Sequence, residues 1–133
     1  MVLLILLVLA LFVLETLLPA SFRYMRGGDA GQKLAMALGP RDNLPPQSMT
    51  GARSERALAN MHEALPVFLA LALLNLIVGT AADMAVTGAT VFFVARLLYV
   101  PAYLAGVMAL RTIIWVVSIA GLVMMLIPLL TRI

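Results

Sequence analysis

The segment "RALANMHEALPVFLALALLNLIVG", residues 56–79, decides the fold, because a long apolar run begins with a cluster of polar side chains. About 20 predominantly apolar residues are enough for a helix to cross the hydrocarbon core of a bilayer. Charged and amide groups in hydrocarbon cost several kcal/mol each when unpaired, so a membrane helix that retains them usually uses them. The segment therefore predicts a membrane-spanning helix with functional polar groups at one end.

The composition extends this prediction to the whole chain. Of the 133 residues, 64% are apolar and only 11% are charged, whereas about a quarter of the residues in a soluble domain are charged. Three further apolar segments have the length of a span. We therefore expect an all-α membrane protein with one integral membrane domain over 1–133, and with four transmembrane helices at about 1–20, 54–79, 84–104 and 111–131.

The distribution of basic residues predicts the topology. Six of the nine Lys and Arg residues lie between the first two apolar segments: Arg23, Arg26, Lys33, Arg41, Arg53 and Arg56. Such clustering marks a cytoplasmic loop by the positive-inside rule, here about 22–53, and it makes nucleic-acid binding an unnecessary interpretation. Both termini are then periplasmic or lumenal.

Local signals refine the expected boundaries. Pro19 is expected to mark the exit of the first span, and Ser54 is an acceptable N-cap for the second. Within the loop, "QKLAMAL" at 32–38 predicts a short helix between turn-forming residues.

The side chains that are absent limit the chemistry. The chain has no cysteine and one histidine, His62. Disulfides, thiolate metal sites and cysteine nucleophiles are excluded, and no metal site is expected, because a second histidine is lacking. We expect His62 to make a pore-side or interhelical hydrogen bond. Any thiol chemistry must use the thiol of a substrate.

The predicted topology brings polar residues of three helices to one membrane depth. Residues spaced i, i+4 and i+7 share one helix face, and at about 1.5 Å of rise per residue Glu63 and Arg96 lie at equal depth. The expected pocket at the cytoplasmic end combines a stripe on 54–79, a stripe on 84–104 and the first residue of 111–131: Arg56, Asn60 and Glu63; Arg96, Tyr99 and Tyr103; and Arg111.

Each of these residues also has a structural interpretation. Arginines at helix ends can be interface anchors, tyrosines can belong to an aromatic belt, and Asn60 can join two helices. Glu63 and Arg96 can form a structural ion pair, and Glu15 can pair with a neighbouring arginine. Together, however, arginines, a carboxylate, an amide and phenols suit a small zwitterionic or multiply anionic ligand from the cytosol.

These residues resemble the motifs of the MAPEG family, the membrane-associated proteins in eicosanoid and glutathione metabolism, which includes microsomal glutathione transferases. The pattern Arg56-x3-Asn60-x2-Glu63 is similar to the family's signature on its second span. "ARLLYVPAY" resembles its Arg-x2-Tyr-x3-Tyr pattern, here Arg96, Tyr99 and Tyr103, and an arginine follows. "GPRD" at 39–42 and "RSERALAN" at 53–60 look like bacterial members, which implies a bacterial inner membrane.

The resemblance implies a left-handed up-down four-helix bundle. It also implies a homotrimer that binds glutathione between adjacent subunits near the cytosolic face. Residue by residue, Arg56, Asn60 and Glu63 would hold the ends of the tripeptide, and Arg96, Tyr99 and Tyr103 would contact it from the third span. Arg111 would stabilise the thiolate, because a fixed cation lowers the pKa of a thiol, which is about 8.5 when free. Membrane lipids would surround the protein and the bilayer would supply lipophilic small molecules as electrophiles.

Two departures from the eicosanoid-forming branch are visible. Ala64 stands where that branch has a tyrosine, which removes one ligand hydrogen bond. The gap between Tyr103 and Arg111 is one residue longer than in that branch, and one residue turns a helical side chain by about 100°. The direction of the Arg111 side chain is therefore left open by the sequence.

Three functions are compatible with these features. The first is a glutathione transferase or peroxidase, and the second is a non-catalytic protein of the same fold that binds a lipid or a thiol. The third is a small proton-coupled drug exporter that uses Glu15. Such an exporter has short loops, and the basic loop of about 30 residues argues against it. Loss of resistance to a cationic dye in Glu15→Gln, but not in Glu63→Gln, would select the exporter.

Overall fold

The structure, a computed structural model, describes residues 1–24, 28–40 and 46–132. This part of the chain is all-helical. Four helices are long and apolar enough to cross a membrane, and a shorter helix, α2, joins the first two of them. The elements are α1 (Val2–Tyr24), α2 (Ala30–Leu38), α3 (Met49–Val78), α4 (Asp83–Ala105) and α5 (Met108–Leu130).

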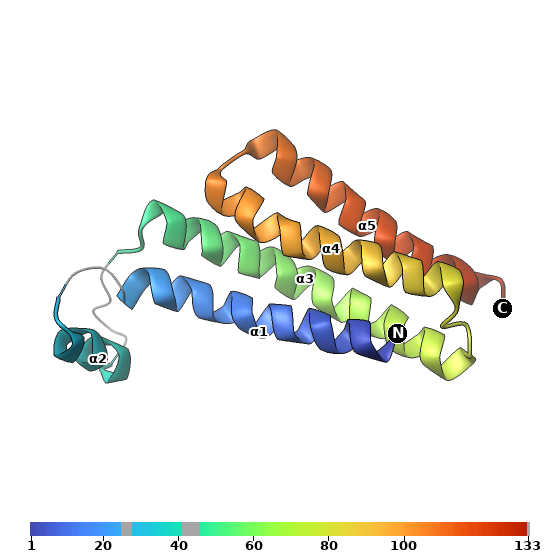
Figure 1. Cartoon of the computed structure of the whole chain (residues 1–133), viewed down its shortest axis with the longest axis horizontal. Coiled ribbons are helices and arrows are strands. Elements are labelled where there is room, and N and C mark those ends of the chain that lie inside the picture. Colours follow the sequence, from blue (N-terminus) through green and yellow to red (C-terminus); the bar gives the residue numbers. More distant parts are fainter. Residues whose placement is uncertain (25–27, 41–45, 133) are drawn as a thin grey trace.

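The long helices alternate in direction along one common axis (Figure 1). The two chain termini lie at one end, hereafter the terminal end. Helix α2 and the turn between α4 and α5 lie at the opposite end, hereafter the α2 end. This arrangement agrees with an even number of membrane crossings, and it brings the polar segments of α3, α4 and α5 to the same end.

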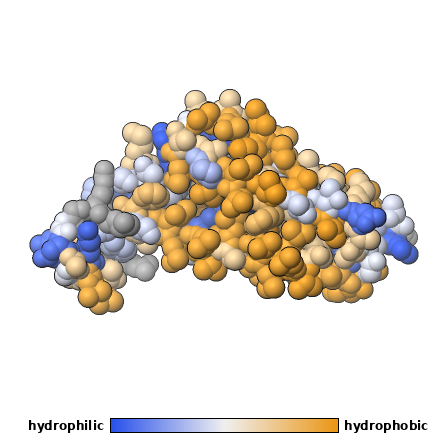
Figure 2. Space-filling model, in the orientation of Figure 1, coloured by the Kyte–Doolittle hydropathy of each residue, from blue (hydrophilic) through white to orange (hydrophobic). Residues whose placement is uncertain are grey.

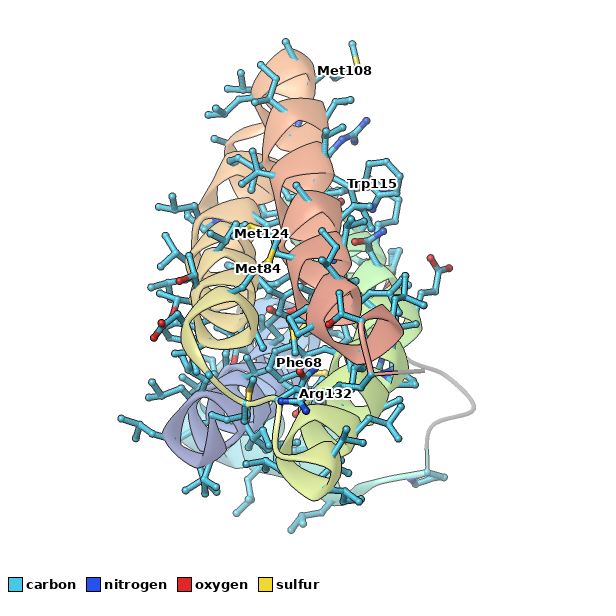
Figure 3. All side chains as sticks on the ribbon, turned by 90° about the vertical axis from the view of Figure 1, so that its right-hand side faces the viewer. Phe68, Met84, Met108, Trp115, Met124 and Arg132 are labelled. Atoms are coloured by element: carbon cyan, nitrogen blue, oxygen red, sulfur yellow. The ribbon has the colours of Figure 1, made fainter. Side chains whose placement is uncertain are left out.

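The outer surface of the long helices is apolar. Figure 2 shows a broad hydrophobic band over the four long helices, with hydrophilic residues at the two ends. In the view along the helices, side chains such as those of Met108 and Trp115 project outward (Figure 3). A soluble monomer rarely exposes so large a contiguous apolar surface, whereas a bilayer requires one. The surface is that of an integral membrane protein.

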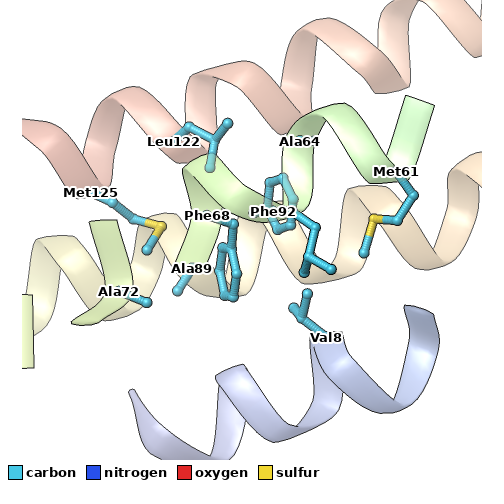
Figure 4. Packing of buried hydrophobic residues seen from close by; sticks show 10 residues of the cluster. Val8, Met61, Ala64, Phe68, Ala72, Ala89, Phe92, Leu122 and Met125 are labelled. Atoms are coloured by element: carbon cyan, nitrogen blue, oxygen red, sulfur yellow. The ribbon is translucent and has the colours of Figure 1, made fainter. Parts of the chain in front are cut away.

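The core is built on two stacked phenylalanines. Phe68 of α3 and Phe92 of α4 lie with ring centroids 4.7 Å apart and planes within 12°. Val8 from α1 and Met125 from α5 close the cluster, and all four side chains are fully buried (Figure 4). The core therefore joins all four long helices.

Several expected boundaries differ from the observed ones. Ser54 is not the N-cap of the second span: α3 begins at Met49, and Ser48 caps it by accepting a hydrogen bond from the Gly51 N–H. Ser54 lies inside the helix and donates to the Gly51 carbonyl. Helix α1 continues through Pro19 to Tyr24, because a proline inside a helix removes one backbone hydrogen bond and can bend the helix without ending it. The short helix predicted at 32–38 is confirmed as α2.

Some residues of the sequence-based predictions lie outside the described residues. These are Arg26 of the basic loop and both Arg41 and Asp42 of the "GPRD" motif.

Candidate functional site

A small polar hollow lies between α3, α4 and α5 near the α2 end. Its volume is about 260 Å³, and its lining combines an amide, two phenols, a guanidinium, a hydroxyl and an indole, from Asn60, Tyr99, Tyr103, Arg111, Thr112 and Trp115. Four of the seven residues predicted for the site thus come together here: Asn60, Tyr99, Tyr103 and Arg111. We call this space the polar hollow.

Helical spacing arranges the wall that α4 contributes. Tyr99 and Tyr103 are one turn apart, and their ring centroids are 5.5 Å apart. The guanidinium of Arg111, in the first turn of α5, lies 4.8 Å from the centroid of the Tyr103 ring. A guanidinium at this distance is attracted by the negative face of the aromatic ring. Arg111 is therefore directed toward α4 despite the extra residue that precedes it.

A second space, the apolar hollow, adjoins the polar hollow. It has a volume of about 370 Å³, and it shares Asn60 and Trp115 with the polar hollow. Glu63 and Arg96 line it at the polar side, and the remaining lining is mostly aliphatic: Ala64, Val67, Leu71, Ile119, Leu122, Val123 and Leu126. The apolar hollow has the apolar lining with few polar groups that is usual for small-molecule sites.

Arg96 acts on the site through Asn60. Its side chain is 1% exposed, and its Nη1 donates a hydrogen bond to Oδ1 of Asn60 over 2.5 Å. The guanidinium also lies 5.2 Å from the ring centroid of Phe92 and 5.4 Å from that of Tyr99. Because Arg96 orients the Asn60 amide, the Asn60 N–H groups are directed away from Arg96.

The ion pairs considered from the sequence are not formed. Among the described residues, Arg23 of α1 and Glu55 of α3 make the one salt bridge, over 2.8 Å, whereas Glu63 and Arg96 do not. Glu15 is 4% exposed and its Oε2 has no hydrogen-bond partner in the described part of the chain.

Two residues singled out from the sequence lie away from the hollows. Arg56 is exposed on α3 and lines neither hollow. The Nδ1 atom of His62 is 3.0 Å from the Leu58 carbonyl oxygen in the same helix, and its ring meets Phe12 edge-on at 5.0 Å. The hydrogen bond of His62 therefore lies within its own helix, in place of the expected pore-side or interhelical one, and its contact with α1 is the aromatic one with Phe12. The described residues contain no cluster suited to a metal ion.

Sequence reasoning missed two residues of the polar hollow, Thr112 and Trp115. Trp115 follows Arg111 by four residues, so the i, i+4 rule applied to Arg111 could have found it. It also missed Arg53, whose Nη1 donates to the Leu104 carbonyl at the end of α4 over 2.9 Å. No signal in the sequence distinguishes Arg53 from the other basic residues of the loop.

These observations define an integral membrane protein with four spans and a polar site beside an apolar one at the end that bears the long connection. The sequence profile of the MAPEG family matches residues 1–131, which is essentially the whole chain, so this protein belongs to the MAPEG family. The family includes glutathione transferases and is generally associated with glutathione. A search of curated proteins found no match.

Proposed function

We propose that this protein is a membrane-bound glutathione transferase or peroxidase that activates the glutathione thiol for attack on lipophilic electrophiles or hydroperoxides. The observation that carries the proposal is the junction of the two hollows at Asn60 and Trp115. A charged, water-soluble thiol fits the polar hollow, and an apolar co-substrate fits the apolar one. Reaction between them requires this proximity.

Each side chain has a role in the proposal. Arg111 is the catalytic residue, because its fixed positive charge favours the thiolate over the thiol. Glu63 binds the ammonium group of glutathione, and Tyr99, Tyr103 and Asn60 donate hydrogen bonds that orient the peptide. Arg96 holds Asn60 in place. These groups lie at the α2 end. In this proposal the protein lies in a bacterial inner membrane, with the α2 end cytoplasmic and both termini periplasmic.

Both reactions use only the thiol of glutathione and the co-substrate. In conjugation, the thiolate sulfur forms a bond to an electrophilic carbon, and the leaving group departs with its bonding electrons. In peroxide reduction, two glutathione thiols are oxidised to one disulfide, while the O–O bond is cleaved to give an alcohol and water. Neither reaction needs a metal or a cysteine of the protein.

A homotrimer would complete the site. Arg56 is exposed and lines neither hollow of its own subunit, so in an oligomer its guanidinium can contact glutathione bound beside a neighbouring subunit. This explains how Arg56 can belong to the site although it lines neither hollow.

The test measures glutathione conjugation with purified protein in lipid vesicles and a reactive aryl halide. We expect a rate above buffer, and at least a tenfold lower kcat in Arg111→Ala, which loses the cation beside the thiol. Arg132→Ala is the matched control, because Arg132 is exposed at the terminal end. Absence of a rate above buffer with both the aryl halide and a lipid hydroperoxide would refute the proposed transferase or peroxidase activity.

A non-catalytic glutathione-binding protein is the second candidate. The contact of Arg111 with the Tyr103 ring supports it, because the cation already has an aromatic partner within the chain. Saturable binding of glutathione without turnover would select this alternative.

A further inference from the structure

The corner between α4 and α5 sets the direction of Arg111. Helix α4 ends at Ala105 and α5 begins at Met108, so only two residues reverse the chain. Gly106 has φ +79°, a left-handed conformation that glycine adopts without steric cost, and its N–H donates to the Tyr103 carbonyl over 3.1 Å. Arg111 follows within the first turn of α5, so a small change at this corner moves its guanidinium.

Arg53 of α3 is seated on this corner. Its Nη1 donates a hydrogen bond to the Leu104 carbonyl over 2.9 Å. A Cβ atom on Gly106 would lie 2.6 Å from Nη2 and 2.7 Å from Cζ of Arg53, closer than such atoms approach. The last carbonyl groups of a helix lack partners within the helix and carry its negative dipole end, so a cation there is favourable. Gly106 thus provides both the turn and the space that Arg53 occupies.

Arg53 thereby links two walls of the polar hollow directly. It extends from α3, the helix that carries Asn60, to the end of α4, the helix that carries Tyr103. The same corner leads into α5, which carries Arg111 in its first turn. No other side-chain hydrogen bond in the described residues joins α3 to this corner.

We infer that Arg53 is a positioning residue: by binding the α4–α5 corner to α3, it holds Arg111 over Tyr103 and facing the polar hollow. The catalytic consequence of this inference rests on the proposed function, whereas its structural consequence does not. Gly106 has a role in the same contact, because it leaves the space that the Arg53 guanidinium occupies.

The structural consequence is tested without any substrate. Trp115 is the single tryptophan of the chain and lies one turn after Arg111 on α5. Its fluorescence anisotropy in lipid vesicles therefore reports the mobility of the start of α5. We expect lower anisotropy in Arg53→Met, which keeps the apolar stem but loses the hydrogen bond, and in Gly106→Ala, which removes the space. Arg53→Lys retains the cation and is expected to stay close to the parent protein.

Arg132→Met is the matched control for the loss of an arginine, since Arg132 lies at the other end of the chain. Unchanged anisotropy in both Arg53→Met and Gly106→Ala would overturn the inference. Thermal unfolding of the same samples shows whether each variant is folded. Because two different changes attack the same contact from its two sides, failure of one variant to fold leaves the other as the test.

The catalytic consequence is tested by the pH dependence of kcat for conjugation at saturating glutathione. This profile reports the pKa of the bound thiol, because kcat reflects the groups of the enzyme–substrate complex. When Arg111 is displaced, we expect the profile of Arg53→Met to move toward the free-thiol value of about 8.5, and that of Arg53→Lys to stay in place. A merely structural Arg53 would lower the melting temperature and leave the profile unmoved, which would overturn the inference. Absence of turnover in the parent protein would instead refute the proposed function, and the anisotropy would still decide the role of Arg53.

Discussion

The two ends of the four-helix structure differ in how fully their buried polar groups are hydrogen-bonded. At the terminal end, Asn75 is fully buried, and its Nδ2 donates to the carbonyls of Leu71 and Met125 over 2.8 and 2.9 Å. Its Oδ1 accepts from the Thr80 hydroxyl over 2.9 Å. Toward the α2 end, several buried side-chain atoms have no partner among the described residues, and they belong to Glu15, Arg23, Gln47 and Arg96.

Helix packing shows the same contrast. At the terminal end, Gly88 of α4 and Gly121 of α5 face one another, and a Cβ atom on either would lie within 2.7 Å of the other's carbonyl oxygen. Small residues let two membrane helices approach this closely. Nearer the α2 end, α4 and α5 enclose the polar hollow. Buried polar groups are normally satisfied, so a region that leaves them without partners is the part of this molecule suited to a ligand.

The largest expected effect comes from forcing α4 and α5 apart at the terminal end. In Gly88→Val, the side chain would meet the Gly121 carbonyl and backbone atoms of α5, which cannot move aside as a flexible side chain would. We expect a loss of about 3 kcal/mol or more in unfolding free energy, at the upper end of the range for overpacking. The measurement is reversible unfolding in detergent.

Gly31→Ala is the control for Gly88→Val, because a Cβ on Gly31 meets only an ordinary contact at 3.5 Å. Equal stability of the two variants would contradict the close contact of α4 with α5 at Gly88 and Gly121.

An intermediate effect is expected from Asn75→Ala. The change removes hydrogen bonds to Leu71, Met125 and Thr80 and leaves the Thr80 hydroxyl without its acceptor. We expect about 1–3 kcal/mol of lost stability, with the KM for glutathione unchanged, because Asn75 lies outside both hollows. A changed KM with unchanged stability would reverse the roles that we assign to the two ends.

The smallest effect on stability is expected from Arg96→Met, toward the α2 end. The variant removes a buried cation, two of whose nitrogen atoms have no hydrogen-bond partner among the described residues. We therefore expect stability to fall little or even to rise. The variant also frees the Asn60 amide, and we expect roughly tenfold weaker glutathione binding, the loss of about one hydrogen bond to a charged group. Calorimetric titration and thermal unfolding of the same sample check both results. Weaker folding with unchanged binding would make Arg96 a structural residue only.

The sequence-based prediction was most accurate where the signal is local. The spans and the short helix α2 follow from the length and polarity of contiguous segments, and the Tyr99 and Tyr103 pair follows from helical spacing. It was wrong at the start of the second span, where Ser54 was expected to be the N-cap. Helix α3 begins earlier, at Met49, and Ser48 caps it, because a capping preference alone does not locate the start of a helix. The predicted glutathione roles of Arg56, Asn60, Glu63, Arg96, Tyr99, Tyr103 and Arg111 stay predictions.

The amino-acid sequence by itself determined that the chain is an all-helical membrane protein of the MAPEG family with polar residues gathered at one end of its spans. Only the tertiary structure decided which of those residues meet. Helical periodicity defines the faces of one helix, but the rotation of one helix against another depends on packing between segments far apart in sequence. The approach of Gly88 to Gly121 and the contact of Arg53 with the α4–α5 corner set that rotation here. They bring Arg111 to Tyr103 and leave Arg56 on the surface.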